Sequence, residues 1–372
     1  MQVAIDLYRD ADSMKAEATL VFSAAVADNF SFVLSSSLSI DAISTNGKSL
    51  DFNVESADDS FRSLNKITVL LQEKADAINI LYSGKPEGYH TIVDDDVFAV
   101  NFYSAWYPVC INTEIAAYTV RFHDDYYTHM VNAAYDTDEK LWLYQPRDFD
   151  CNILAYKTAS SLSDEKLTLY YSGEINSLAK MYFDAYSNAA AFCESIYTTK
   201  RLKKSTLAIL PKGNAYDGYC RSSLIVLGGF VDNENYVRHL VAHEIAHNWC
   251  IGADFTWEDW LNETTAEWTA LLYELKSGNS AEFNNLINKA ISSARSMPPI
   301  RTADGSRPDG VHVKGTALFY EVYTKHGYDA VAAMLKIFDE LETKTTEAFI
   351  REISSQLGSE IASIITSGID AA

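Results

Sequence analysis

The local pattern of the chain changes once, near Gly173, and this change constrains the fold more than any other feature. Up to residue 172, short β-prone runs such as AEATLVFSAAV and NKITVLLQ are separated by Asn, Gly, Asp and Ser. After Gly173, the run INSLAKMYFDAYSNAAAFCESIY places apolar residues three and four positions apart, as an amphipathic helix does. From Asn235 onward nearly every segment has helical spacing, apart from the loop at 296–311. Strands followed by helices predict an α+β protein of two domains, an antiparallel β-sandwich over 1–172 and a mostly helical domain over 173–372.

Composition excludes several kinds of partner. Fifty-one acidic and 30 basic residues give a net charge of -21, which disfavours nucleic acid. The chain contains no apolar run of about 18 residues, so we expect no membrane-spanning helix. It begins without the basic-then-apolar order of a signal peptide, although a processed chain could have lost one. The cysteines are odd in number and scattered, which predicts reduced thiols in a cytoplasmic protein. No pattern indicates the oligomeric state.

The stretch HLVAHEIAHNWC carries the chemistry. On a helix, His243 and His247 lie one turn apart on the same face and can bind one metal ion together. Glu244 follows the first histidine and can act as a general base toward a water molecule at that metal. His239, a further turn upstream, is a poor third ligand because two helical turns span about 11 Å. The pattern predicts a metal site with His243 and His247 as ligands.

A glutamate on the next helical run can complete this site. Glu263 lies in WLNETTAEW, sixteen residues after His247. Two imidazoles and one carboxylate suit zinc better than calcium or magnesium, which prefer oxygen ligands, and they leave a fourth position open. Glu267, one turn after Glu263, is the alternative ligand or a residue that supports the ligands.

These residues resemble a known family. HEIAHNW followed by WLNE is similar to the aminopeptidase N-like family of gluzincin zinc metallopeptidases, and VKG at 313–315 is similar to that family's Tyr-x-Lys-Gly motif. The resemblance implies a β-rich N-terminal domain, a thermolysin-like catalytic domain and one zinc ion held by His243, His247 and Glu263. It covers roughly residues 1 to 340. It also implies a short form, without the large helical C-terminal domain of the family.

Three departures from the family pattern matter. The family separates the second histidine from the glutamate by eighteen residues and this chain by fifteen, but the WLNE context still favours Glu263 over Glu267. The family's glutamate that binds the substrate amine aligns with Cys220. The family's catalytic tyrosine aligns with His312, whose imidazole N–H can stabilise the tetrahedral oxyanion instead. The other interpretation of His312 is a partly exposed side chain at a helix start, without a catalytic role.

The segment around Cys220 is the predicted substrate-binding strand. As an edge strand, it would align a peptide backbone by β-addition. Arg221 could attract a substrate carboxylate or form a surface ion pair. The residues concerned are Asp217, Gly218, Tyr219, Cys220 and Arg221.

The sequence therefore predicts a zinc-dependent, aminopeptidase-like peptidase with Glu244 as general base and a peptide as substrate. One alternative is a binding or scaffold protein on a peptidase fold, because the amine anchor and the tyrosine are changed. Another is a zinc hydrolase that acts on a non-peptide substrate. Glu244 favours an enzyme, since a scaffold has no need of it.

Overall fold

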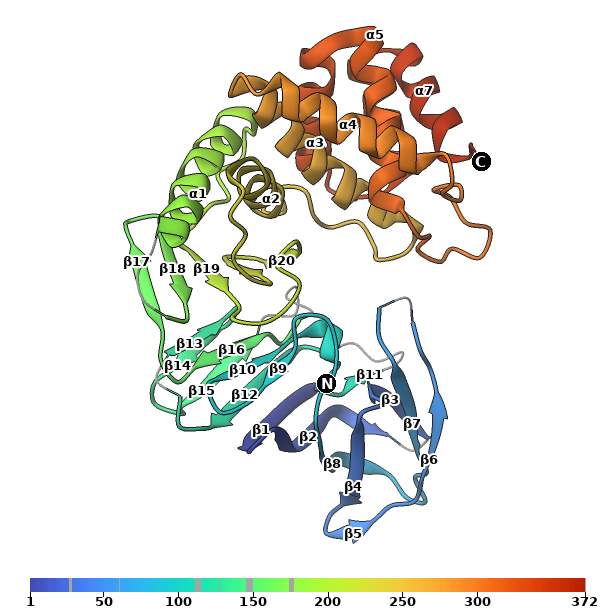
Figure 1. The fold of residues 1–372 in the computed structure, drawn as a ribbon. Helices are drawn as coiled ribbons and strands as arrows, with labels where there is room; N and C mark the ends of the chain where they lie inside the picture. The colour runs from blue at the N-terminus through green and yellow to red at the C-terminus, as the bar shows by residue number, and fades with distance from the viewer. Residues whose placement is uncertain are drawn as a thin grey trace. The chain divides into compact units, whose positions relative to one another are not determined.

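The computed structural model describes residues 1–26, 29–59, 61–110, 115–126, 128–144, 150–173 and 177–371. Most strands precede the helices along the chain, with β19 to β21 following the first helix, so the predicted α+β class is confirmed (Figure 1). By their contacts the residues form two compact units. The first comprises Met1–Ser160, Tyr170–Glu174 and Ala208–Asn214, and the second comprises Ser161–Leu169, Ile175–Leu207 and Ala215–Ala372.

The first unit is built from three sheets within the described residues. One has eight strands in the order β14 (Ala134–Asp136), β15 (Leu141–Tyr144), β12 (Ala117–His123), β1 (Gln2–Asp10), β2 (Ser13–Val26), β8 (Ala75–Gly84), β4 (Leu38–Thr45) and β5 (Lys48–Ser49). A second contains β13 (Thr128–Val131), β16 (Ile153–Tyr156), β10 (Val97–Val100) and β9 (Ile92–Val93). The third contains β11 (Val109–Cys110), β3 (Phe30–Ser35), β7 (Leu64–Val69) and β6 (Phe52–Ser56).

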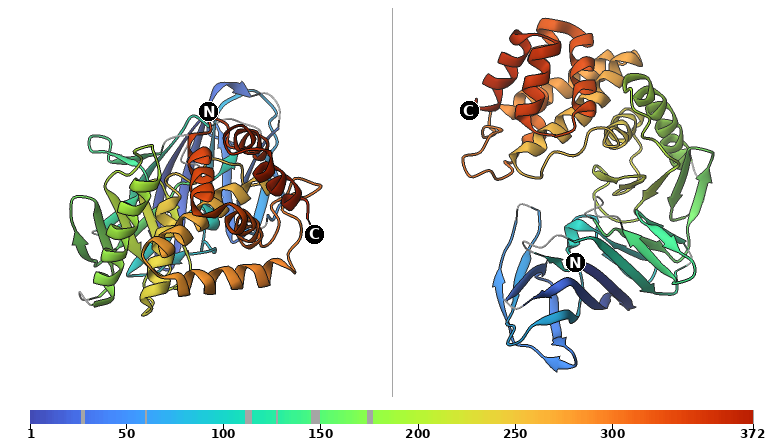
Figure 2. Two further views of the ribbon diagram at one scale, coloured as in Figure 1. Left: turned by 90° about the horizontal axis from the view of Figure 1, so that it is seen from above. Right: turned by 180° about the vertical axis from the view of Figure 1, so that it is seen from behind.

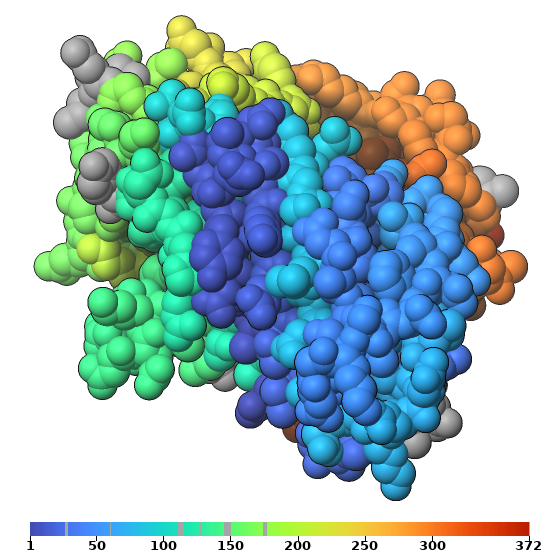
Figure 3. Space-filling view, turned by 90° about the horizontal axis from the view of Figure 1, so that it is seen from below, coloured from blue at the N-terminus to red at the C-terminus, as the bar shows by residue number. Residues whose placement is uncertain are grey.

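Alternation of side chains explains these strands. In β1, every second residue from Val3 to Leu7 is buried, while the residues between them face outward. The sequence pattern suggested an antiparallel sheet. One pair of strands differs, because β1 and β12 pair in parallel. Distant segments must meet to make such a pair, and periodicity within one strand does not specify it. Figure 3 shows one face of the molecule, where the side chains of the N-terminal segments, coloured blue and cyan, form a continuous surface.

Two strands that precede residue 173 belong to a separate sheet. The strands β17 (Ser160–Ser163) and β18 (Leu167–Tyr171) belong to a five-stranded sheet with β19 (Ser205–Ile209), β21 (Leu224–Leu227) and β20 (Gly218–Arg221). They therefore share a sheet with strands that follow residue 173, although we assigned them to the sandwich. The boundary between residues 172 and 173 stays a prediction. In this sheet β20 is an end strand, hydrogen-bonded to β21.

Helices make up most of the second unit. They are α1 (Ser177–Ile196), α2 (Glu234–Ala246), α3 (Trp260–Lys276), α4 (Ser280–Ala294), α5 (Val311–Glu340), α6 (Thr346–Gln356) and α7 (Ser359–Ile369). The predicted first helix began at Ile175, which lies outside the described residues. Figure 2 shows α3 to α7, coloured orange to red, packed together in both views. The long α5 is interrupted at Gly327, whose φ of 81° is the left-handed conformation that glycine adopts without strain.

The structure also describes the helices by their apolar character and the state of the cysteines. No helix among the described residues combines the length and the apolar character needed to cross a membrane. All five cysteines lie in the described ranges, where each is a free thiol.

Candidate metal centre

Helix α2 carries the HEIAH motif, and local interactions explain its start. The side chain of Asn233 caps the helix by accepting a hydrogen bond from the backbone N–H of Tyr236. The buried apolar face comprises Val237, Val241 and Ile245. His243 lies in the last turn, and His247 follows at the C-cap with helical angles of φ -60° and ψ -12°. The two imidazoles are therefore one turn apart on the same side of the helix.

Hydrogen bonds orient both imidazoles. Nδ1 of His243 lies 3.1 Å from Oε2 of Glu267, and Nδ1 of His247 lies 3.1 Å from the carbonyl oxygen of Cys250. An ionised carboxylate and a carbonyl only accept hydrogen bonds, so each Nδ1 carries the hydrogen. The lone pair of each neutral ring is then on Nε2, where it can bind a metal.

Glu263, in the first turn of α3, faces both of these Nε2 atoms. Its Oε2 lies 3.6 Å from Nε2 of His243 and 3.7 Å from Nε2 of His247. Ligand atoms around a tetrahedral zinc ion are separated by about 3.3 Å, given bonds of about 2.0–2.1 Å. Burial favours the neutral acid, but the neighbouring His312, His243 and His247 outweigh it and lower the pKa of Glu263. The distances between the anionic oxygen of Glu263 and the two Nε2 atoms are thus close to those between ligand atoms that share one zinc ion.

The short connection between α2 and α3 is held by Asn262. Its Oδ1 accepts from the N–H of Ala253 at 3.0 Å, and its Nδ2 donates to the carbonyl of Ala253 at 3.0 Å. The same amide donates to Oδ1 of Asp259 at 2.8 Å. These contacts are buried, so the loop is tied to the first turn of α3. The WLNE stretch therefore fixes the position of Glu263 even with fewer residues in the connection.

Glu267 supports the site instead of facing the two Nε2 atoms. One carboxylate oxygen accepts from Nδ1 of His243, and the other lies 3.1 Å from Nε2 of His239. A carboxylate behind a metal-binding histidine fixes its ring and raises its basicity. His239 is thus bonded to this carboxylate, and its ring nitrogen Nε2 is directed at Glu267 and not at the ligand atoms.

His312, at the start of α5, completes the cluster. Its Nδ1 lies 3.1 Å from Oε2 of Glu263, and one ligand atom each of His243, Glu263 and His312 lie within 4.8 Å of one another. The helices approach closely here because of Gly315. A Cβ at Gly315 would lie 1.7 Å from Oγ1 of Thr264, the neighbour of Glu263. The glycine of the VKG motif therefore allows α5 to bring His312 beside Glu263.

Glu244 points into the protein beside β20. Only 4% of the residue is exposed, and burial raises the pKa of its carboxyl group. Among the described residues its Oε2 has no hydrogen-bond partner. A methyl group at Gly218 would lie 3.3 Å from its Oε1, so the strand passes next to this carboxylate. A buried carboxylate with a free oxygen is suited to take a proton from water.

The predicted substrate strand coincides with β20 and the residue before it. Tyr219 and Cys220 are buried, and the guanidinium of Arg221 donates to the carbonyl of Cys220 at 2.9 Å and lies 5.3 Å from the ring centroid of Tyr219. Burial raises the pKa of the Cys220 thiol, and Glu244 adds to this shift. A neutral thiol thus occupies position 220, which the sequence resemblance aligns with an amine-binding glutamate. The main-chain carbonyl of Asp217 accepts from the N–H of Gly228 at 3.0 Å.

Comparisons with known proteins give a structural match without a sequence match. No protein-family model and no curated protein matches the chain. The M1 zinc metallopeptidase from Deinococcus radiodurans superposes with a TM-score of 0.65 at 14% identity, over 99% of this chain and 93% of that one. Leukotriene A4 hydrolase from Saccharomyces cerevisiae superposes with a TM-score of 0.69 at 13% identity, over 99% of this chain and 66% of that one. The chain has the M1 metallopeptidase fold.

Sequence reasoning missed two residues that contact this site of the M1 fold. Arg307 lies in the loop before α5, and its guanidinium is 3.3 Å from Nε2 of His312. Its partner Asp259 precedes α3 and is buried. Neither residue belongs to a pattern with a recognised spacing. Their roles depend on two loops that meet only in the folded chain.

The contact between Glu267 and His243 leads to a prediction about metal affinity. We expect Glu267→Gln to weaken zinc binding about 10- to 100-fold, because His243 loses its anionic acceptor. Competition with a chromophoric chelator measures this change. The matched control is Glu274→Gln, which alters a buried glutamate of the same helix that pairs with Arg238 at 2.8 Å. Equal zinc affinity in both variants would contradict a supporting role for Glu267.

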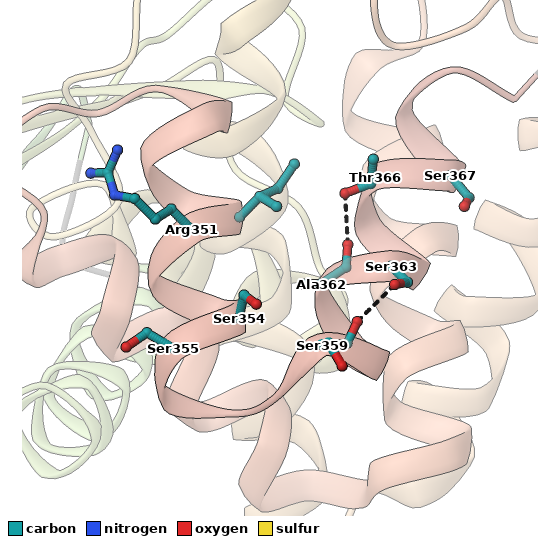
Figure 4. A pocket seen from close by; sticks show the side chains of 9 residues that line it. Arg351, Ser354, Ser355, Ser359, Ala362, Ser363, Thr366 and Ser367 are labelled. Carbon is teal, nitrogen blue, oxygen red and sulfur yellow. Dashed lines mark hydrogen bonds between the residues drawn. The ribbon is translucent and has the colours of Figure 1, made fainter.

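A groove lies between α6 and α7, and none of its lining residues is a histidine (Figure 4). It has a volume of about 550 Å³ and a lining rich in small hydroxyl residues. Within it, Ser363 donates to the carbonyl of Ser359 at 2.7 Å, and Thr366 donates to that of Ala362 at 2.8 Å. Both hydroxyls therefore donate to carbonyl oxygens of their own helix, α7.

Proposed function

We propose that this protein is a zinc-dependent peptidase with an aminopeptidase-like active site. The observation that carries the proposal is the arrangement around Oε2 of Glu263. Nε2 of His243 and Nε2 of His247 lie 3.6 and 3.7 Å from it, and the adjacent Glu244 keeps one buried oxygen without a partner among the described residues. Three donors and a nearby free carboxylate are what a hydrolytic zinc site requires.

The donors fit zinc on their chemistry. Two neutral imidazoles and one carboxylate form a common zinc set that leaves a position open, whereas calcium and magnesium prefer oxygen ligands. His243, His247 and Glu263 would hold the ion. A zinc ion bound there supplies Lewis acidity, which polarises a carbonyl and makes a nearby water molecule more acidic.

The remaining steps belong to side chains of this protein. Glu244 accepts the proton of the attacking water and passes it to the leaving amine, and its burial favours this role because its raised pKa makes it a better proton acceptor. His312 donates a hydrogen bond to the oxyanion of the tetrahedral intermediate. The strand β20, at the end of its sheet, aligns the substrate backbone by main-chain hydrogen bonds.

The solved structures support a peptide as substrate. One of the structures with this fold, an M1 zinc metallopeptidase mutant from Deinococcus radiodurans, is described as bound to a Tyr-Ser-Ala substrate and has a TM-score of 0.65 with this chain. We extend the same substrate class to this protein. The predicted cytoplasmic location fits the free cysteines and remains a prediction.

Cys220 favours a second candidate for substrate choice. A buried, neutral thiol cannot bind a substrate ammonium group as a glutamate does. The protein would then cut within peptides, or act on a substrate that has no free amine. Glu244 and the zinc ligands would have the same roles in either case.

Zinc-loaded protein and a mixed peptide library with free or acetylated amino ends test the proposal. Product masses show where cleavage occurs, and Glu244→Gln is the inactive comparison. Trimming of free amino ends alone supports an aminopeptidase and requires another residue to bind the amine. Equal cleavage of acetylated peptides supports the second candidate. Zinc binding without cleavage of any peptide would refute the peptidase proposal.

A further inference from the structure

Arg307 connects two parts of the candidate metal centre. Its Nη2 lies 3.3 Å from Nε2 of His312, and its Nε lies 2.6 Å from Oδ2 of Asp259. Only 12% of the Arg307 side chain and 1% of the Asp259 side chain are exposed. Asn262 donates to the other carboxylate oxygen of Asp259 at 2.8 Å. The guanidinium is therefore held in place beside His312 by a buried ion pair.

The chemistry of a guanidinium decides which nitrogen of His312 carries hydrogen. Arginine only donates hydrogen bonds, so Nε2 of His312 must be the acceptor. A neutral imidazole has one N–H, which is then on Nδ1. Nδ1 lies 3.1 Å from Oε2 of Glu263, and an ionised carboxylate only accepts. Both contacts of the ring thus require the same tautomer.

The same reasoning separates two roles for His312 near the metal. A fourth metal ligand would bind through the lone pair of Nδ1, which would move the hydrogen to Nε2. That hydrogen would then face an N–H of Arg307, and two donors would oppose each other. While Arg307 is in place, His312 is suited to donate from Nδ1 and not to bind the metal. A zinc ion held by His243, His247 and Glu263 would then have an open fourth position, as catalytic zinc sites do.

We propose that Arg307, held by Asp259, is a positioning residue that sets the tautomer of His312 and directs its Nδ1–H at the metal centre. This inference rests on the proposed function, since a fixed N–H is useful there as a donor to a developing oxyanion. It adds two residues to the site that no motif indicates. It would also keep His312 from becoming a fourth ligand of a zinc ion bound there.

Nuclear magnetic resonance of zinc-loaded, ¹⁵N-histidine-labelled protein measures the tautomer directly. Long-range ¹H–¹⁵N correlations show which ring nitrogen carries hydrogen, and loss of signals in His312→Gln assigns the residue. We expect Nδ1–H in the wild type. Arg307→Met leaves Asp259 buried without its cation, so the main variant is Asp259→Asn with Arg307→Met, which removes both charges together. Without Arg307, an Nε2–H of His312 no longer opposes another donor, so Nδ1 can bind the zinc ion as a fourth ligand. We therefore expect the Nε2–H tautomer in this variant, and a kcat about 10- to 100-fold lower with little change in KM.

Two further variants separate positioning from stability. Arg307→Lys retains a group that only donates, and should keep the Nδ1–H tautomer. Arg238→Met with Glu274→Gln removes another buried ion pair of the same unit, with an N–O distance of 2.8 Å, and should leave the tautomer of His312 unchanged. An Nε2–H tautomer in the wild type, or an unchanged tautomer after loss of Arg307, would overturn the proposal.

The resonance measurement also separates this proposal from the proposed function. If the wild type cleaves no peptide but shows an Nδ1–H that depends on Arg307, the tautomer assignment stands and the peptidase function fails. If peptides are cleaved while the tautomer ignores Arg307, the function stands and the positioning role is wrong.

Discussion

Replacement of Glu244 by glutamine is expected to lower kcat by about 10²- to 10⁴-fold, the range that a general base contributes. The amide has the same shape but cannot accept the proton of the attacking water. Glu244 is 4% exposed, and one of its oxygens has no partner among the described residues, so no neighbouring group there already uses this oxygen. Initial rates on a cleaved peptide and metal analysis of the same sample give kcat and zinc content.

Zinc content should remain at the wild-type level in this variant, because the ligand atoms belong to His243, His247 and Glu263. The control is Glu234→Gln, which alters an exposed glutamate in the first turn of the same helix. It should leave kcat and zinc content unchanged. A Glu244→Gln protein with wild-type kcat would remove Glu244 from the mechanism. Loss of zinc together with kcat would show that it acts on metal binding.

Substitution of Glu263 by alanine is expected to abolish high-affinity zinc binding and, with it, the stabilisation that zinc provides. A ligand at 1,000 times its dissociation constant stabilises the folded state by about 4 kcal/mol. The melting temperature of the wild type should therefore fall on removal of zinc with a chelator and recover when zinc is added. In Glu263→Ala, the melting temperature should not respond to either treatment. Scanning calorimetry at fixed free zinc measures both.

The control for this substitution is Glu347→Ala, which removes an exposed glutamate from the first turn of α6, just as Glu263 lies in the first turn of α3. It should keep the zinc response of the wild type. A Glu263→Ala protein whose melting temperature still rises with zinc would mean that other groups hold the ion. His312 is the first to examine, since its Nδ1 lies 3.1 Å from the same carboxylate oxygen.

Much of the fold could be predicted because local patterns specify it. The alternation of buried residues in β1 and the helical spacing in α2 arise from neighbours in the chain, and both elements form where the pattern indicates. Local patterns did not predict which strands share a sheet. β17 and β18 have ordinary strand patterns, yet they belong to the sheet of β19, with β18 pairing with β19, and β1 pairs in parallel with β12. Backbone hydrogen bonds between distant segments decide such pairings.

Some residues of the candidate site could also be found from local patterns, whereas others could be assigned only from the folded chain. The spacing of His243 and His247 follows from one helical turn, and the WLNE stretch marks Glu263, so these residues and Glu244 are readable from the chain. Their roles remain predictions. Sequence left open whether Glu267 or Glu263 is the ligand, and the structure favours Glu263 because Glu267 bonds Nδ1 of His243.

The sequence by itself determined the α+β class, the helix that presents the two histidines and the residue types that suit zinc. These depend on short-range periodicity and on side-chain chemistry, which do not require the rest of the fold. Only the tertiary structure decided that Gly315 lets α5 approach Thr264 and that Arg307 reaches His312. Those contacts arise from the packing of segments far apart in the chain, and no local pattern encodes the distance between them.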